Sequence, residues 1–350
     1  MVKHSNANLA SICPGELGFT MPAEWQAHSR CWMAWPSEHW QWQDFPAVEQ
    51  AYADVANAIA GFEPVSMLAR PQNATNARKL CAANVEIIEA PLNDSWMRDT
   101  GPSFVKNSAS GAIAGVDWRF NCWGGYYPGY QHDAQIANRV LDHLGMDAYH
   151  ASLVLEGGAL HVDGEGTLVT TESVVLNPNR NWGMDKASAE DEIYRATGAT
   201  RVIWLPGDLK GETSDMTDGH VDGIMCFVKP GVVLFERDLA AEGVFAELER
   251  ENRRALELAK DAAGRKLEII DIAVDHSQIG EGHELFCSSY INFYLPNGGL
   301  VMPAYGVAAD EQVRAQLAKI FIDRKIVSVN LNAIAPGGGG IHCISQQQPA

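Results

Sequence analysis

Five short polar stretches recur along this chain of 350 residues at nearly equal intervals. They are represented by Asp99, Glu156, His220, Glu281 and Cys343, whose successive separations are 57, 64, 61 and 62 residues. A period of this size is typical of a fold assembled from repeated structural units. Residue identity between the intervals is weak. The spacing alone is therefore only suggestive of five similar units around one shared centre.

The hydropathy pattern predicts a mixed α/β architecture. Helical periodicity is clearest over residues 45–62, 132–146 and 244–260. Shorter apolar runs predict strands at 64–69, 85–90, 111–118, 167–176, 201–205, 223–235, 267–272, 290–295 and 299–305. Because strand pairs alternate with single helices, mixed sheets are expected.

Composition limits the classes of partner. The chain has 26 Lys and Arg against 44 Asp and Glu, a net charge of −18. This charge repels nucleic acid and anionic membranes and favours small cationic molecules, although half of it is explained by solubility alone. With 46% hydrophobic residues the chain can build a large core. Length by itself suggests two domains, but α/β folds of this size often form one.

The cysteines predict a reduced, cytoplasmic protein. There are seven, an odd number, scattered without a CxxC pair, which argues against a disulfide framework or a zinc ribbon. The N-terminal stretch lacks an apolar run long enough for a secretory signal or a membrane span.

Unusual polar residues define the candidate site. Residues 93–104 bring Asp94, Trp96 and Asp99 together just after an apolar run, and Glu156 is followed by two glycines. At the other end of the chain, four consecutive glycines precede Cys343. Glycines lose much backbone entropy on folding, and a disordered tail has no use for a thiol placed after them. An active-site loop would explain both.

The motif HVDG occurs twice, at 161–164 and 220–223. At His161 a turn and a second strand follow, so this copy predicts a hairpin and a structural histidine. At His220 acidic residues flank the ring on both sides and an apolar strand follows. An ionisable group at the start of a core strand is placed where its pKa is shifted, which favours a functional histidine.

Other interpretations of these residues are weaker. His220, Asp222 and His283 offer metal-ligand chemistry, but no paired-histidine motif is present. The glycines before Cys343 lack the helix with Lys and Ser or Thr that a phosphate loop needs. Trp96 and Trp123 are either packing residues or the walls of a cation site.

Several ordered motifs carry a family resemblance. They are MPAEW, WMRDTGP, NCWGGYYP, LEGG, LNPNRN, TDGHVD, YINFYLPNGG and GGGGIHC, spread from about residue 20 to residue 349. Together they resemble the agmatine deiminases, within the guanidino-group modifying family of peptidylarginine deiminases, arginine deiminases and amidinotransferases. The resemblance implies a single domain over residues 1–350, a five-bladed α/β propeller of ββαβ units with a central active site. It also implies a part in polyamine metabolism and putrescine biosynthesis.

The resemblance also implies residue roles. Cys343 corresponds to the nucleophile and His220 to the general acid/base. Asp99 and Asp222 correspond to the carboxylates that hold the guanidinium, and Glu156 to an acidic residue found at this place in arginine deiminases. The residues expected to line the substrate site are Trp96, Asp94, Asp215, Met216, Trp123 and Gly339.

The expected chemistry needs neither metal nor cofactor, because a guanidinium brings its own positive charge. Two carboxylates fix this planar cation opposite the sulfur. The thiolate of Cys343 attacks, His220 protonates the departing ammonia, and water then hydrolyses the amidino-cysteine.

The chain departs from the family at the substrate's tail. An aspartate is usual where Met216 stands, four residues before the histidine, and a lysine is common at Tyr126. Asp215 or Asp94 would then bind the amine of agmatine, or the substrate has a less charged tail. Also open are amidino transfer to an amine, a non-catalytic binder of cationic ligands, and homo-oligomer formation.

Overall fold

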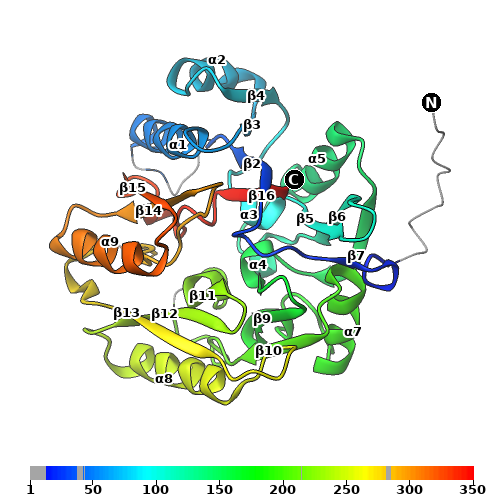
Figure 1. The fold of residues 1–350 in the computed structure, drawn as a ribbon. Helices are drawn as coiled ribbons and strands as arrows, with labels where there is room; N and C mark the ends of the chain where they lie inside the picture. Colours follow the sequence, from blue (N-terminus) through cyan, green and yellow to red (C-terminus); the bar gives the residue numbers. More distant parts are fainter. Residues whose placement is uncertain (1–12, 38–41, 43, 214, 281–284) are drawn as a thin grey trace.

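The computed structural model describes residues 13–37, 42, 44–213, 215–280 and 285–350. These residues form a mixed α/β fold with five separate sheets, which are arranged around the middle of the molecule with the longer helices on the outside (Figure 1). The mixed α/β prediction is therefore confirmed. The expectation centred on Glu281 falls outside the described residues.

The sheets run in chain order around the molecule. The first is β1 (Phe19–Thr20), β5 (Ser103–Asn107), β6 (Ile113–Arg119) and β7 (Ala148–Val154). The second is β10 (Arg201–Leu205), β9 (Thr167–Thr171) and β8 (His161–Val162), and the third is β11 (Met225–Lys229), β12 (Val232–Asp238) and β13 (Glu268–Val274). The fourth is β14 (Gly299–Ala304) and β15 (Lys325–Asn330), and the fifth is β16 (Ser345–Pro349), β2 (His28–Ala34), β3 (Val65–Ala69) and β4 (Val85–Glu89).

Most sheets repeat one connection, in which an antiparallel pair is followed by a helix and a parallel strand. β5 and β6 are antiparallel, as are β8 with β9, β11 with β12, and β16 with β2. The parallel crossovers β6–β7, β9–β10, β12–β13, β14–β15 and β2–β3 pass through one long helix each. Two neighbouring parallel strands need such a crossover, because the end of the first strand and the start of the second lie at opposite ends of the sheet.

The crossover helices are α1 (Phe45–Ala60), α5 (Ile136–Leu144), α7 (Lys186–Thr197), α8 (Gly243–Leu258) and α9 (Ala308–Ile320), while α2 (Pro71–Leu80) joins β3 to β4. Shorter helical segments are α3 (Met97–Thr100), α4 (Cys122–Gly125), α6 (Glu172–Val175), η4 (Gly157–Ala159), η5 (Val221–Gly223) and η7 (Ala335–Gly337). The turns η2 (Gly15–Leu17), η3 (Asp133–Gln135) and η6 (His276–Gln278) complete the helical segments of the described residues. The three helices predicted from periodicity correspond to α1, α5 and α8 and are confirmed.

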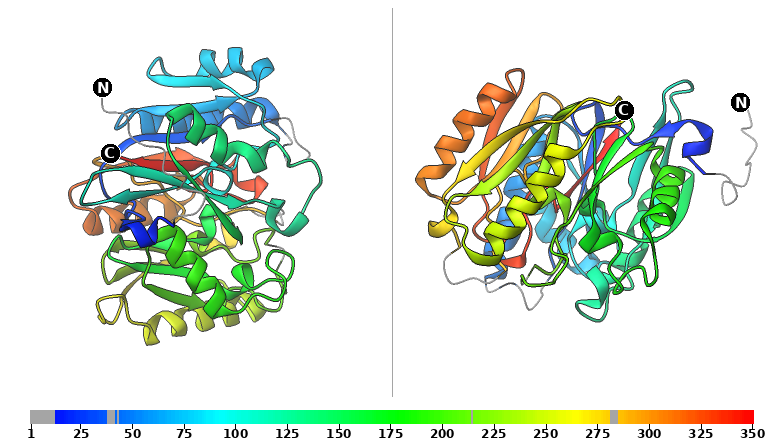
Figure 2. Two further views of the ribbon diagram at one scale, coloured as in Figure 1. Left: turned by 90° about the vertical axis from the view of Figure 1, so that its right-hand side faces the viewer. Right: turned by 90° about the horizontal axis from the view of Figure 1, so that it is seen from below.

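The two ends of the chain meet in one sheet. The C-terminal strand β16 pairs antiparallel with β2, with Gln346 opposite Trp32. In the side view of Figure 2, β16 lies in the middle of the molecule. Because Cys343 comes two residues before β16, this pairing places the thiol at the centre of the fold.

Two strand predictions are wrong in part. Residues 167–176 begin as β9, but the chain then turns into α6. Residues 290–295 are buried without being a strand, and only Tyr294 forms an isolated bridge. Their backbone donors have another acceptor, because the N–H groups of Tyr290 and Ile291 donate to the Glu236 carboxylate at 3.0 and 2.9 Å. An apolar run can therefore be buried without a strand ladder when a side chain accepts its hydrogen bonds.

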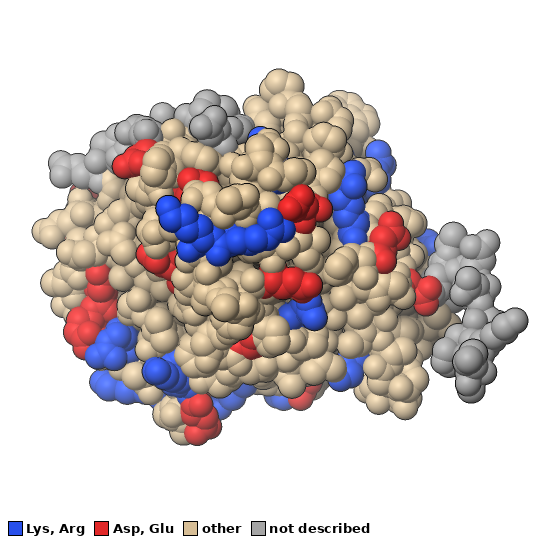
Figure 3. All heavy atoms as spheres, turned by 90° about the horizontal axis from the view of Figure 1, so that it is seen from above, with Lys and Arg blue, Asp and Glu red and all other residues tan. Residues whose placement is uncertain are grey.

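Two further observations concern the charges on one face and the apolar character of the helices. The face seen from above carries Lys and Arg interspersed with Asp and Glu, so the excess acid is not gathered there (Figure 3). Among the described residues, no helix is both long enough and apolar enough to cross a bilayer.

Candidate active site

The glycine run brings Cys343 into a crowded centre. Gly338 has the left-handed φ of +89°, so one sharp turn depends on glycine. The neighbouring glycines serve close packing instead. A Cβ on Gly339 would lie 2.3 Å from the Trp96 ring, and one on Gly340 would lie 2.3 Å from the Asn292 amide. Gly339 is thus buried against Trp96 and lies outside the lining of the main pocket.

The Cys343 thiol faces two oxygen atoms. Its Sγ lies 3.7 Å from Asp222 Oδ2 and 3.5 Å from Asn292 Oδ1. Burial raises the pKa of this thiol well above its usual value, and the nearby Asp222 and Asp99 carboxylates raise it further. Arg98 holds the loop from the other side, because its backbone N–H donates to the Cys343 carbonyl at 3.0 Å. In the free protein the sulfur is therefore held as a protonated thiol.

His220 lies between two carboxylates. Its Nε2 is 3.2 Å from Glu156 Oε2 and its Nδ1 is 3.8 Å from Asp99 Oδ1. Burial lowers the pKa of His220, but Asp99 and Glu156 outweigh it and raise this pKa to about 9. The ring is therefore an imidazolium at neutral pH, in the protonation state of a general acid.

Glu156 itself is held by Arg180, a residue to which the sequence analysis gave no role. The Arg180 Nε donates to both carboxylate oxygens at 3.0 Å, and both side chains are buried. Burial raises the pKa of Glu156, but Arg180 and His220 hold it below its usual value. Glu156 is thus occupied in orienting His220. In the sequence, the motif LNPNRN, which contains Arg180, could have indicated a role for this residue.

Asp99 is positioned by a strained backbone. Cys122 and Trp123 adopt positive φ values of 61° and 50°, which side chains other than glycine rarely do. In this conformation the Trp123 Nε1 donates to Asp99 Oδ2 at 2.9 Å, while the backbone of Gly158 donates to Asp99 Oδ1 at 2.9 Å. Trp123 is thus a buried support for Asp99.

Gly158 marks the point where the three groups converge. A Cβ there would lie 2.6 Å from His220 Nδ1, 2.8 Å from Asp99 Oδ1 and 3.1 Å from Asp222 Oδ2. The second glycine after Glu156 is required because any side chain would occupy this space. The structure therefore brings His220, Asp99 and Asp222 together around one small volume beside the thiol.

Asp222 has a further partner in His342, whose Nδ1 lies 2.8 Å from Asp222 Oδ2. On the far side of the same ring, Nε2 lies 3.2 Å from Glu24 Oε2. Burial raises the pKa of Asp222, but His342 outweighs it and holds that pKa low. Neither His342 nor Glu24 was given a role from the sequence, although they lie in the motifs GGGGIHC and MPAEW.

Asp94 lies in a different position from the one expected of a substrate contact. Its Oδ2 accepts hydrogen bonds from Trp96 Nε1 at 3.0 Å and Tyr127 Oη at 2.9 Å, and its Oδ1 accepts from Ser95. Neither Asp94 nor Trp96 is among the residues that line the main pocket. Asp94 therefore holds the Trp96 and Tyr127 side chains in place. This arrangement does not favour Asp94 as the partner of a substrate amine.

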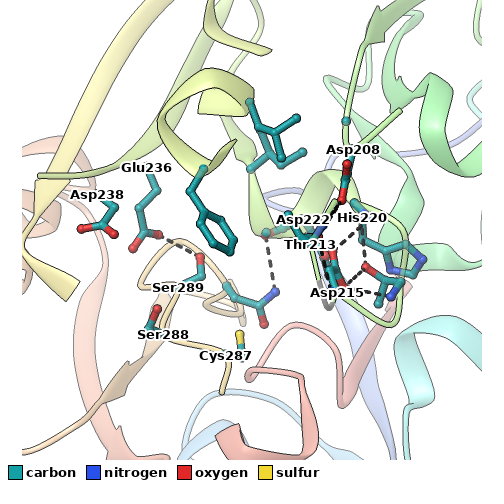
Figure 4. Close-up of a pocket in the computed structure, with 18 of the residues that line it drawn as sticks. Asp208, Thr213, Asp215, His220, Asp222, Glu236, Asp238, Cys287, Ser288 and Ser289 are labelled. Carbon is teal, nitrogen blue, oxygen red and sulfur yellow. Dashed lines mark hydrogen bonds between the residues drawn. The ribbon is translucent and has the colours of Figure 1, made fainter. Parts of the chain in front are cut away.

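The main pocket has a volume of about 440 Å³ and opens onto the thiol, His220 and Asp222. Figure 4 shows Glu236 and Asp238 on one side of it and His220, Asp222 and Asp215 on the other. The carboxylate residues of the lining are Asp208, Asp215, Asp222, Glu236, Asp238 and Glu249, and the described lining contains no Lys or Arg. Such a pocket favours cations.

Met216 and Asp215 both line this pocket. Met216 is buried, and its sulfur would lie 3.0 Å from a Cβ on Gly338. Asp215 is exposed, with its oxygens accepting from the backbone N–H groups of Thr217 and Gly219. Of the two carboxylates expected to bind a substrate amine, Asp215 lines the pocket and Asp94 does not. Tyr126 is exposed and lies outside the lining.

The remaining candidates lie elsewhere. His161 is buried in the β8–β9 hairpin, as predicted from the first HVDG copy. His283, the third member of the metal alternative, falls outside the described residues. Glu24, His161 and His342 bring three ligand-type atoms within 4.8 Å of one another, but Glu24 and His342 already bond to each other and the cavity beside them has no room for a water molecule. We therefore assign no metal to them.

Comparisons with known proteins point to one family. The family model described as Porphyromonas-type peptidyl-arginine deiminase matches residues 20–349. A putative agmatine deiminase of Legionella pneumophila strain Philadelphia 1 is 43% identical over 343 residues, covering 97% of this chain and 97% of that protein. The agmatine deiminase of Stutzerimonas stutzeri strain A1501 is 40% identical over 362 residues, covering 96% and 97%. A solved structure of the Enterococcus faecalis agmatine deiminase superposes with a TM-score of 0.90 at 34% identity, covering 97% of this chain and 98% of that one.

Proposed function

Since this chain belongs to the Porphyromonas-type peptidyl-arginine deiminase family, we propose that it hydrolyses agmatine to N-carbamoylputrescine and ammonia through an amidino group carried on Cys343. It is accordingly a hydrolase that acts on C–N bonds of linear amidines, with a place in polyamine metabolism. The observation that carries the proposal is the convergence of His220, Asp99 and Asp222 on the space left by Gly158, beside a thiol.

The carboxylates and the thiol divide the work on a guanidinium. Asp99 and Asp222 accept hydrogen bonds from its N–H groups, which fixes the planar carbon near the sulfur. Their charges raise the pKa of the Cys343 thiol in the free enzyme, whereas a bound guanidinium lowers it. The thiol therefore releases its proton to solvent when substrate arrives, and the thiolate forms where it is needed.

The first half-reaction forms a sulfur–carbon bond. The thiolate of Cys343 adds to the guanidinium carbon, giving a neutral tetrahedral adduct. The His220 imidazolium donates a proton to one amino group, the C–N bond breaks and ammonia leaves. The product on the enzyme is a cationic S-alkylthiouronium, and His220 is left neutral.

The second half-reaction uses the neutral ring. Water adds to the thiouronium carbon while His220 accepts one of its protons. The C–S bond then breaks while the hydroxyl proton of the adduct passes to solvent, which releases the neutral ureido product and the thiolate. Glu156, held by Arg180, keeps the ring oriented through both steps. One histidine thus serves as acid and then as base.

The pocket lining, the arrangement of the sheets and the cysteines support the remaining parts of the proposal. The carboxylates of the pocket favour agmatine, with Asp215 as the partner of the amine in place of the aspartate that Met216 replaces. The five sheets around one centre support a five-bladed α/β propeller that spans the chain as a single domain. We place its activity in the cytoplasm, where the seven free thiols of the described residues stay reduced.

The test is product analysis with purified enzyme. Agmatine should yield ammonia and N-carbamoylputrescine in equal amounts, and an added amine acceptor should capture no amidino group. Cys343→Ser should abolish turnover because a hydroxyl is too weakly acidic to attack. Cys287→Ser, which changes the other thiol of the pocket, should retain kcat. Amidino transfer to the acceptor would make the protein a transferase, and turnover by Cys343→Ser would contradict the mechanism.

A further inference from the structure

Behind Asp222, a buried histidine joins two carboxylates. His342 Nδ1 lies 2.8 Å from Asp222 Oδ2, and its Nε2 lies 3.2 Å from Glu24 Oε2. The exposed fractions of Glu24, Asp222 and His342 are 5, 4 and 4%. A neutral imidazole has one N–H and can donate to only one of two carboxylates, whereas an imidazolium donates to both. The geometry therefore requires a charged ring if both contacts are hydrogen bonds.

The neighbouring histidine provides a contrast inside the same cluster. The His161 ring stacks on His342 with centroids 6.0 Å apart and planes inclined by 14°. Its Nδ1 accepts a hydrogen bond from the Phe227 backbone at 3.4 Å, so this nitrogen carries no proton. Burial lowers the pKa of His161 to about 4, in spite of the nearby Glu24 carboxylate. One ring of the stacked pair is thus charged and the other neutral.

We propose that His342 is a positioning residue for the reaction: its imidazolium, anchored by Glu24, keeps Asp222 ionised and fixed beside Cys343 so that the carboxylate can receive the guanidinium. The inference rests on the proposed function in giving Asp222 that role. It adds two residues, Glu24 and His342, to which the mechanism above assigns no part.

The electrostatic surroundings decide the sign of the effect. The charged and titratable groups that face Asp222 and His342 from the packed elements are Glu24, Arg98, Asp99, His161, His220 and Cys343. Burial and Arg98 lower the pKa of His342, but Glu24 and Asp222 raise it above its usual value. Because His342 is the largest influence that lowers the pKa of Asp222, removing its charge lets that pKa rise. Asp222 would then take up a proton at a higher pH and release the guanidinium.

The variants separate charge from packing. Asparagine at 342 can still donate one hydrogen bond to Asp222, in place of Nδ1, but carries no charge. We expect His342→Asn to raise KM for agmatine about ten-fold with a smaller change in kcat, and to move the acidic limb of kcat/KM up by roughly one pH unit. Glu24→Gln should shift the limb in the same direction by less. His161→Asn, the same change in the stacked ring, should leave the limb in place.

A spectroscopic measurement covers the case in which His342→Asn does not fold. In ¹⁵N-histidine-labelled wild type at neutral pH, His342 should have both ring nitrogens protonated. Its signal is identified by its loss in His342→Asn or its shift in Glu24→Gln. A neutral His342, or an unmoved acidic limb in folded His342→Asn, would overturn the inference while leaving Cys343 as nucleophile. A wild type that does not hydrolyse agmatine would instead refute the proposed function, whatever the charge of His342.

Discussion

The two copies of the HVDG motif, at 161–164 and 220–223, have the same four residues in different surroundings. In the first, Asp163 closes the β8–β9 hairpin, because its Oδ1 accepts from the backbone of Glu165 and Thr167 at 2.8 and 2.9 Å. In the second, Asp222 lies 3.7 Å from the Cys343 thiol and 2.8 Å from His342. Both aspartates are buried. One organises a turn and the other faces the Cys343 sulfur.

The histidines of the two copies differ in charge for the same reason. His161 has a backbone N–H directed at its ring and a pKa lowered to about 4 by burial. His220 is equally buried, but Asp99 and Glu156 raise its pKa to about 9. The motif therefore carries no chemistry by itself. The residues that the fold brings to each ring determine whether it acts as an acid.

The largest test of this comparison replaces each histidine in turn. His220→Ala should lower kcat by about three orders of magnitude, because both half-reactions use the ring. His161→Ala should keep kcat near that of wild type and lose stability, by roughly 1–3 kcal/mol, through lost packing. Steady-state kinetics and denaturant unfolding measure the two effects. Equal losses of kcat would remove the distinction between the copies.

The aspartates allow the same test with a smaller expected effect. Asp222→Asn should lower kcat/KM by about two orders of magnitude, because the guanidinium loses a charged partner and its fixed position. Asp163→Asn makes the identical chemical change in the hairpin, where Oδ1 can still accept both backbone bonds. Its kcat/KM should stay within about two-fold of wild type. Comparable losses in both variants would show that burial, and not the site, sets the effect.

The pH profile sharpens the comparison further. In wild type, kcat/KM should fall as the pH rises through about 9, where the free enzyme loses the His220 proton. The Asp99 and Glu156 carboxylates raise the pKa of His220. Glu156→Gln should therefore move the basic limb of kcat/KM to lower pH, by roughly one unit. A limb that stays in place would mean that another group controls it.

The smallest expected effect concerns Met216, at the start of the segment that leads to the second copy. A carboxylate at 216 would give the substrate ammonium a second charged partner beside Asp215, so Met216→Asp should improve kcat/KM for agmatine by about ten-fold or less. Met216→Asn is the matched neutral control. Activity is compared on agmatine, guanidinobutyrate, an uncharged alkylguanidine and arginine. A wild type that prefers the uncharged tail, and that Met216→Asp converts to agmatine preference, would contradict agmatine as the substrate.

Much of the fold could be predicted because its signals are local. The helix over 45–62 and the strand at 201–205 follow from periodicity and short apolar runs. The stretch 290–295 could not be predicted, because its backbone hydrogen bonds depend on Glu236, a residue from another sheet. A local sequence pattern does not show a hydrogen-bond acceptor that comes from a distant part of the chain.

The candidate site divides in the same way. Motifs located Cys343, His220, Asp99 and Asp222, the groups that meet at the centre. The partners Arg180, His342 and Glu24 were not assigned, because each acts through another residue that only the fold brings near. Asp94 was one of the two carboxylates expected at the substrate amine, yet its oxygens accept from Trp96 and Tyr127.

The central claim, a covalent amidino group on Cys343, three residues after the glycine run, is tested most directly by mass spectrometry. Wild-type enzyme is mixed with agmatine, quenched in acid during turnover and digested. We expect an amidino adduct on the peptide that contains Cys343, formed far more slowly in His220→Ala because that variant lacks the acid that protonates the departing ammonia. An adduct on any of the other six cysteines, or turnover with no adduct on Cys343, would contradict it.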